Sequence, residues 1–347
     1  MIANVLQAIE SRMVTPFQPW RPDPLIAPPA PDEPLALALA REAAGDLAGA
    51  LSAYEAALAS RPGEVDVLAG LARLAGLMEM PRQALAWWEQ VLALDPSSLE
   101  AADGRGRSLA DLHRYGDAVE VLRRAILAHP HEARLWNTLG VILNQQGDSP
   151  AALAFFDEAV RLEPTFAAAL YNRGDARFDL GELAYAEADF HAAARHTADP
   201  GQTAVIAFAR ALLALHRGDL GAGWDAYEAR LSPDHPSAPV FEAPGEPWTP
   251  DTPLEGAHLL AIGEQGLGDE VMFASLVPDL VAALGPRGRL SLALEPRLHA
   301  LARRSFPGVE VLAYATERRE GRPHRSVAPG GGRSIELWAP LASLPRA

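Results

Sequence analysis

Small and large apolar residues recur with a fixed spacing over most of the chain before residue 232. Alanine stands at five positions spaced 34 residues apart, which are Ala50, Ala84, Ala118, Ala152 and Ala186. A large apolar residue follows each alanine four positions later, at Tyr54, Trp88, Leu122, Phe156 and Phe190. A small residue lets two helices cross closely, and a large residue on the same helix face fills the gap beside it. The pattern therefore predicts a repeated pair of packed helices.

A period of about 34 residues is typical of tetratricopeptide helical hairpins. The blocks begin at Pro31, Val65, Leu99, Ala133 and Ala167 without insertions. Prolines that stop the second helix stand at Pro62, Pro96, Pro130 and Pro164, and Gly45, Gly147 and Gly181 mark turns between helices. A sixth, atypical unit ends near Ser232, as expected for a terminal repeat whose outer face another domain covers. We therefore predict a tetratricopeptide superhelix over residues 31–232.

The periodicity changes after this array. Residues 233–255 are rich in Pro, Asp and Ser and predict an irregular linker. From residue 256 to 347, apolar runs alternate with helical segments: strands are expected in HLLAIGE, RLSLALE, VEVLAYA and IELWAP, and SVAPGGGRS is expected to be a loop. Such alternation favours βαβ units and a parallel sheet. The sequence thus predicts an α/β Rossmann-like domain over residues 256–347.

The first thirty residues form a separate segment. Residues 2–13 predict a short helix, and a dense run of prolines follows. Proline at this density excludes a helix interior and favours an extended chain. Phe17 and Trp20 are candidates to anchor this chain in a groove. A disordered tail fits the same composition.

Composition narrows the classes of partner. The formal net charge is -15 and no cysteine is present, so neither a basic footprint for nucleic acid nor a cysteine-ligated metal site is expected. The histidines, among them His113, His129 and His191, show no paired ligand spacing, so we predict no metal and no cofactor in this chain. The N-terminus lacks a secretory pattern, and no apolar stretch is long enough to span a membrane. We expect a cytoplasmic protein.

The first helices of the repeats line the concave face of such an array, which is an extended binding surface. Arg and Asn side chains on that face can hold the backbone of an extended peptide. The candidate contact residues are Arg73, Arg107, Arg134, Asn137, Asn144, Tyr171 and Asp175, and the same columns include Asp66, Asp103, Val141 and Phe178. For any single residue, a solvated helix face is the alternative.

The segment Gly263 to Asp269, GEQGLGD, joins the first expected strand of the α/β part to its first helix. Glycines there allow a sharp turn and bring backbone N–H groups close to an anion or a sugar. The third glycine of the dinucleotide-binding spacing is absent, and no Lys-Ser/Thr pair follows as in a P-loop. A tight strand–helix turn with Asp269 as its N-cap is the alternative.

The strings GWDAYEARL, LLAIGEQGLGDEVMFASLVPDL and IELWAPLASLPR carry a resemblance that runs from Gly223 to the C-terminus. They resemble bacterial tetratricopeptide proteins with a C-terminal glycosyltransferase domain, which is similar to the lipopolysaccharide heptosyltransferases. The resemblance implies the N-terminal half of a GT-B fold. It also implies Asp269 as a general base and an acceptor-side loop made by Glu264, Gln265, Gly266 and Gly268.

A GT-B enzyme binds its nucleotide-sugar donor chiefly on a second Rossmann domain, and only residues 257–347 follow Gly256. We therefore expect this chain to transfer no sugar by itself. The resemblance implies protein O-glycosylation, since related architectures modify flagellin. The sequence leaves two functions open. One is a protein that presents an acceptor such as flagellin to a glycosyltransferase domain, and the other is a non-catalytic adaptor whose α/β part caps the repeats.

Overall fold

The computed structural model describes residues 33–319, 322–328 and 334–347. The chain divides into two compact units, Met1–His196 and Thr197–Ala347. The expected helix at residues 2–13 and the proline-rich segment with Phe17 and Trp20 lie outside the described residues.

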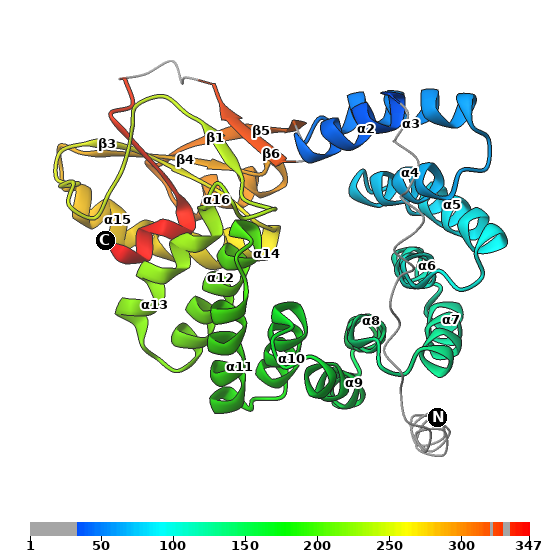
Figure 1. The fold of residues 1–347 in the computed structure, drawn as a ribbon. Helices are drawn as coiled ribbons and strands as arrows, with labels where there is room; N and C mark the ends of the chain where they lie inside the picture. Colours follow the sequence, from blue (N-terminus) through cyan, green and yellow to red (C-terminus); the bar gives the residue numbers. More distant parts are fainter. Residues whose placement is uncertain (1–32, 320–321, 329–333) are drawn as a thin grey trace. The chain divides into compact units, whose positions relative to one another are not determined.

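The first unit consists of helical hairpins that follow one another along the chain (Figure 1). The hairpins are α2 (Glu33–Ala43) with α3 (Leu47–Ser60), α4 (Val65–Leu77) with α5 (Pro81–Leu94), α6 (Leu99–Asp111) with α7 (Tyr115–Ala128), α8 (Ala133–Gln145) with α9 (Ser149–Leu162), and α10 (Ala167–Asp179) with α11 (Leu183–His196). The first helices of the second to fifth hairpins begin at the first residues of the predicted blocks. The predicted helical repeat is therefore confirmed.

The repeating alanines and large apolar residues form the core of this unit. The alanines of the repeating column are at most 1% exposed and the large residues at most 3% exposed. Several large side chains lie directly on glycines. A Cβ atom added to Gly104 would overlap the ring of Trp88, and one added to Gly140 would lie 2.6 Å from Phe156. These glycines are required because only a residue without a side chain leaves room for the ring.

The turns between the two helices of a hairpin share one backbone conformation. Gly45, Gly147 and Gly181 have φ values of 76°, 80° and 75°. Glu79 and His113 occupy the same turn position in the second and third hairpins, each with a φ of 58°. A left-handed backbone costs little for glycine and about 1 kcal/mol or more for other residues. The predicted turn glycines are thus confirmed, and two turns adopt this conformation without glycine.

The second unit begins with the sixth hairpin, α12 (Pro200–His216) and α13 (Leu220–Tyr227), followed by the 3-10 turn η1 (Glu228–Leu231). Ala211 and Tyr227 of this hairpin belong to the same apolar core as Leu259 and Leu292 of the sheet. The division at residues 196 and 197 therefore lies before the end of the predicted array at residue 232. The reason is that the sixth hairpin buries its apolar face against the α/β part.

The sheet has the order β1-β6-β5-β4-β3-β7-β2. Its strands are β1 (Val240–Glu242), β2 (Glu246–Pro247), β3 (His258–Ile262), β4 (Arg289–Leu294), β5 (Glu310–Arg319), β6 (Arg322–Val327) and β7 (Leu337–Pro340). Strands β5, β4, β3 and β7 are parallel neighbours, whereas β6 pairs antiparallel with the second half of β5. The sheet is therefore mixed, and the expected fully parallel sheet is corrected at β6.

Several local expectations also differ from the structure. The linker expected at residues 233–255 contains the short edge strands β1 and β2, and the expected loop SVAPGGGRS begins within β6. The helix expected after β3 is divided into α14 (Leu267–Phe273), the turn η2 (Ala274–Leu276) and α15 (Val277–Leu284). Pro278 stands in the first turn of α15. Since proline has no N–H to donate to the preceding turn, the helix breaks there.

We expect Gly104→Ala to lower the free energy of unfolding by about 1–3 kcal/mol, because the new methyl group overlaps Trp88. Gly76→Ala in α4 is the matched control, because a Cβ atom there meets nothing within 4 Å. Alanine is also the better helix former, so this control is expected to be neutral or stabilising. Urea unfolding followed by circular dichroism measures both. Equal stability of the two variants would contradict the proposed close contact.

Candidate functional site

A groove of about 470 Å³ lies along the first helices of the first unit. Its walls come from α2, α4, α6 and α8, with Trp88 of α5 beside them. The lining includes the apolar residues Leu77, Trp88, Val141 and Ile142 and the polar residues Glu42, Arg73, Arg107, Asp111, Thr138 and Gln145. We call this surface the concave groove. It combines an apolar floor with side chains that donate and accept hydrogen bonds.

Two of the predicted contact residues, Arg73 and Arg107, line the concave groove. Arg73 is held in place, because its guanidinium lies 2.9 Å from a Glu100 carboxylate oxygen and 3.6 Å from one of Glu42. Arg107 is held more loosely. Its side chain is 64% exposed, and its Nε lies 3.6 Å from an Asp103 oxygen. Arg107 is thus the more accessible of the two cations.

Asn137 takes part in contacts between neighbouring repeats. Its Oδ1 accepts a hydrogen bond of 2.9 Å from Asn172, and the residue is only 9% exposed. Asp103 stands at the equivalent position of the preceding repeat and accepts a bond of 2.5 Å from Thr138. In both cases a residue bonds the residue 35 positions later. These bonds form a polar ladder that connects the first helices, which is a structural use of Asn137.

Val141 of the predicted columns also lines the concave groove, whereas the candidate contact residues Arg134, Asn144, Tyr171 and Asp175 lie outside its lining. Asn144 accepts a 2.7 Å bond from Ser149 at the hairpin turn, and Arg134 is exposed at the start of α8. Burial raises the pKa of Tyr171 to about 12, and the Asp175 carboxylate adds to this shift. Burial also raises the pKa of Asp175, to which Asp179 contributes. Tyr171 and Asp175 form a separate, half-buried polar area on α10.

Sequence reasoning missed several residues that line the concave groove. Leu77, Asp111 and Gln145 stand one helical turn after Arg73, Arg107 and Val141, and they also recur every 34 residues. Residues four apart share a helix face, so extending the predicted column by one turn finds them. Trp88 was predicted as a packing residue. It packs on Gly104 and lines the groove as well.

In the second unit, the predicted loop follows β3 and leads into α14. Asp269 accepts a 3.0 Å hydrogen bond from the Gly266 backbone N–H and so closes the first turn of α14. Gln265 has a φ of 65°, and its side-chain Nε2 donates a hydrogen bond of 3.1 Å to the Tyr227 hydroxyl. The arrangement shows the tight strand–helix turn, but the expectation that Asp269 is its N-cap is corrected: Gly266 holds the N-cap position, and Asp269, three residues later, bonds back to the Gly266 N–H. Asp269 is partly exposed, so its carboxylate has contact with solvent.

Glu264 is buried in an ion pair. It is 1% exposed, and its carboxylate receives two bonds from Arg230, of 2.7 and 3.1 Å. A further bond of 3.1 Å comes from the Ala342 backbone N–H. Burial by itself would lower the pKa of Arg230, but the carboxylates of Glu264 and Glu228 together outweigh burial and the pKa is raised. Glu264 therefore ties the loop to η1 and to the C-terminal turn η4 (Leu341–Arg346).

A second arginine holds the other side of the loop. Arg325 of β6 donates to the carbonyl oxygens of Gly263 and Gln265, and its guanidinium lies 4.6 Å from the centre of the Tyr314 ring. The Tyr314 hydroxyl donates a 2.5 Å bond to the buried Glu270. The pKa of Tyr314 is raised, first by burial and then by this bond. The loop is thus fixed from both sides.

Comparisons with known proteins agree with the repeat array. Residues 104–165 match the family model described as tetratricopeptide repeat. Protein FlbA of Caulobacter vibrioides is 47% identical over 302 residues, which cover 87% of this chain and 50% of that protein. Tetratricopeptide repeat protein 7B of Homo sapiens is 33% identical over 93 residues, which cover 27% of this chain and 11% of that protein. The chain spans half the length of Protein FlbA.

Solved structures match the fold of the helical part. One chain of the APC/C hetero-tetramer Cut9-Hcn1 is 19% identical to this chain, with a TM-score of 0.50. The match covers 56% of this chain and 39% of that chain. A tetratricopeptide protein of Thermus thermophilus is 24% identical, with a TM-score of 0.47, and the match covers 51% of this chain and 97% of that chain. The family match and the helical hairpins together show a tetratricopeptide repeat array, a fold whose concave face suits protein partners. Within the described residues, no helix is both long and apolar enough to cross a membrane.

We expect Arg230→Met to lower the free energy of unfolding of the second unit by about 3–5 kcal/mol, because it leaves the Glu264 carboxylate buried without its cation. Arg297→Met is the matched control. Arg297 also pairs with a glutamate, at 2.7 Å, but its side chain is 71% exposed. Exposed pairs contribute about 0–1 kcal/mol. Thermal and urea unfolding of both variants test the difference, and equal losses would show that burial of the pair is unimportant.

Proposed function

We propose that the concave groove binds an extended segment of a partner protein. The observation that carries this proposal is the composition of the groove, in which an apolar floor with Leu77 and Trp88 lies beside the exposed cation Arg107. Leu77 is 61% exposed at the end of α4. An apolar side chain of a partner would cover it. The partner's backbone would lie along the polar rim.

The polar rim suits an extended backbone. Arg107 donates through several N–H groups, and Gln145 both donates and accepts, so together they match alternating carbonyl and N–H groups of a peptide. Arg73 is already fixed by Glu42 and Glu100. A fixed donor loses little conformational freedom on binding, which favours affinity. The groove therefore presents one fixed and one adaptable arginine.

Site-specific photo-crosslinking tests this proposal. A benzophenone amino acid at position 77 is expected to form a covalent adduct with a partner protein in cells. The same group at position 94 is the control, because Leu94 is 54% exposed but does not line the groove. Arg107→Ala is expected to weaken adduct formation at position 77 about tenfold, which corresponds to roughly 1.4 kcal/mol.

Adducts of equal yield from positions 77 and 94 would contradict binding in the concave groove. Arg107→Ala is suited to this experiment because the side chain is 64% exposed. Arg107 pairs with Asp103, whose side chain is buried, so urea unfolding of the variant must show unchanged stability for the altered capture to report on binding.

The α/β part favours a second function, transfer of a sugar to the captured protein. Strand β3 lies between β4 and β7, and all three are parallel. The loop with Asp269 leaves the carboxyl end of β3, where the chain crosses to β4 on one side and later to β7 on the other. In open α/β sheets such a position is where ligands bind. This order supports a Rossmann-like half of a GT-B enzyme. The nucleotide-sugar donor and a cytoplasmic acceptor such as flagellin are proposed from the sequence resemblance alone.

Asp269→Asn separates this function from that of an adaptor. Asparagine keeps a side-chain oxygen that can accept from the Gly266 N–H, so the turn is expected to remain. It cannot act as a general base. If the second unit takes part in sugar transfer, the protein crosslinked at position 77 carries sugar in cells with the unchanged chain and lacks it in cells with the Asp269→Asn variant, as measured by mass spectrometry. A partner without sugar in both strains would support the adaptor.

A further inference from the structure

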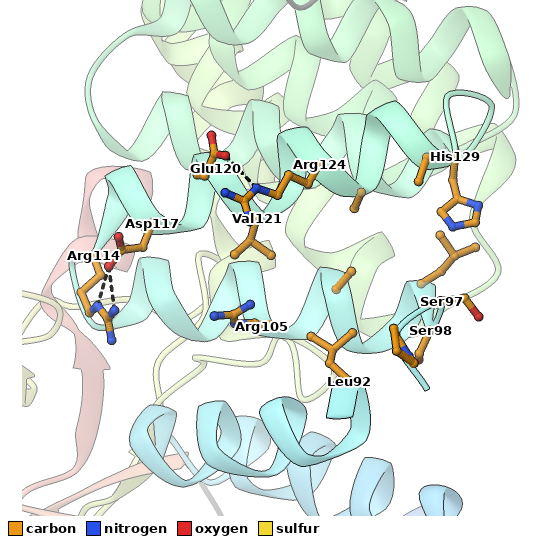
Figure 2. A pocket seen from close by; sticks show the side chains of 15 residues that line it. Leu92, Ser97, Ser98, Arg105, Arg114, Asp117, Glu120, Val121, Arg124 and His129 are labelled. Carbon is orange, nitrogen blue, oxygen red and sulfur yellow. Dashed lines mark hydrogen bonds and ion pairs between the residues drawn. The ribbon is translucent and has the colours of Figure 1, made fainter. Parts of the chain in front are cut away.

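A second groove, of about 470 Å³, lies between α6 and α7 in the third hairpin, with the end of α5 at its border (Figure 2). We call it the outer groove. Its lining includes Leu92 of α5, the turn Pro96–Leu99, Arg105 of α6, and Arg114, Asp117, Glu120, Val121, Arg124 and His129 from α7 and its end. The repeat pattern does not indicate this surface, because its charged residues Glu120 and Arg124 do not recur at the equivalent positions of the other repeats.

The outer groove and the concave groove use different faces of α6. Arg105 lines the outer groove and Arg107 lines the concave groove. Residues two positions apart along a helix are separated by roughly 200° of rotation, so Arg105 and Arg107 point to opposite sides of α6. A ligand in one groove therefore does not occupy the other. The inference below is independent of the function proposed for the concave groove.

The arginines of the outer groove are incompletely paired. The Nε of Arg105 is buried and has no hydrogen-bond partner, and the terminal nitrogen of the same side chain lies 3.4 Å from Glu89. Arg124 is 75% exposed and contacts Glu120 through its Nε at 2.7 Å. Glu120 is shared with Arg123, whose Nε lies 3.1 Å away. One carboxylate thus serves two guanidinium groups, which leaves positive charge in excess.

The two arginines that share Glu120 also lower the pKa of its carboxyl group. The bond from Arg123 and then the bond from Arg124 lower it to about 2, so Glu120 stays charged at any physiological pH and cannot take up a proton to alter the balance. Arg114 is neutralised separately by Asp117 at 2.7 Å. Of the lining arginines other than Arg114, Arg124 is 75% exposed and Arg105 is 36% exposed, so a ligand can reach both guanidinium groups.

Apolar side chains lie between these two arginines. Figure 2 shows Arg105 and Arg124 reaching in from α6 and α7, with Val121 between their guanidinium groups in this view. Leu92, Leu99 and Ala125 extend the apolar part of the lining. A carboxylate that bridges the two arginines would place an adjacent apolar side chain on this floor. The chemistry of the groove thus requires an acid and an apolar group close together.

We infer that the outer groove docks an acidic segment of a partner protein, with a Glu or Asp carboxylate between Arg105 and Arg124 and a neighbouring apolar side chain on Val121. Charge complementarity supports this occupant, because the groove has a cationic excess within a chain whose net charge is -15. Charge-assisted bonds from guanidinium to carboxylate are short and strong. The acidic remainder of the chain disfavours an extended polyanion such as nucleic acid.

The test uses a fluorescein-labelled peptide of alternating glutamate and leucine and its counterpart with glutamine in place of glutamate. Fluorescence polarisation on the 347-residue protein is expected to show saturable binding of the glutamate peptide and at least tenfold weaker binding of the glutamine peptide. Arg124→Gln and Arg105→Gln are each expected to weaken binding at least fivefold. Arg161→Gln is the matched control and is expected to leave the affinity unchanged, because Arg161 also pairs with a glutamate and is 57% exposed but lines neither groove. Arg107→Gln, on the opposite face of α6, shows whether the peptide uses the concave groove instead.

Three outcomes of the peptide and self-association experiments would overturn the inference. Equal binding of the two peptides would show that no carboxylate is recognised, and loss of binding in Arg107→Gln alone would move the peptide to the concave groove. Self-association of the free protein that Arg124→Gln abolishes, measured by sedimentation, would identify a second copy as the occupant. Arg124 is mostly exposed, so its variant is expected to fold, and circular dichroism of each variant confirms this. Tighter binding of a single-stranded oligonucleotide than of the peptide would also overturn it.

Discussion

The packing of large side chains directly against glycines is the contact on which the helical unit's core depends. Tyr54 and Trp88 reach from a second helix onto Gly70 and Gly104 of the following hairpin. In the fourth and fifth hairpins the large residue turns to its own first helix, where Phe156 meets Gly140 and Phe190 meets Gly174. Both arrangements need a residue without Cβ, because ring atoms come within 3 Å of where that atom would lie. Close packing of this kind tolerates little added volume.

This packing determines what the hairpins can present to a partner. In α6, Gly104 lies under Trp88 and Gly106 lies under Leu122, so both glycines are buried. Arg105 and Arg107 alternate with them and are directed to two different grooves. The helix is thus fixed by its smallest residues, and its charged residues remain available. The helix α6 in this way contributes one arginine to each of the two grooves.

The second unit uses a different device to fix its loop. Arg230 and Arg325 hold Glu264 and the carbonyl oxygens of Gly263 and Gln265, so the segment before α14 is constrained from two sides. Buried ion pairs of this type contribute to stability only when both partners are well bonded. Here each charged group has several partners, and the strained φ of Gln265 persists because the surroundings determine it. A rigid loop suits a binding or catalytic role, and it also suits a structural cap.

The repeat length, the starts of the first helices in the second to fifth hairpins and the core columns followed from the sequence, because a 34-residue period constrains residues that are near one another along the chain. Ala50 and its equivalents must be small because two helices cross closely at each of these positions. The loop before Asp269 was also visible, since its glycines lie between an apolar run and a helix. These features depend on local spacing and on turn geometry.

Contacts between distant residues were decided by the tertiary structure alone. Asn137 was predicted to hold a peptide. Instead its side-chain Oδ1 accepts a hydrogen bond from Asn172, because the equivalent helices of adjacent repeats lie side by side. The pairing of Arg230 with Glu264 joins residues 34 apart that belong to different elements. Strand β6 runs antiparallel because the chain reverses after β5, which a composition rich in arginine does not indicate. The outer groove is formed by residues of α5, α6 and α7 that the fold brings together, and no spacing in the sequence indicates it.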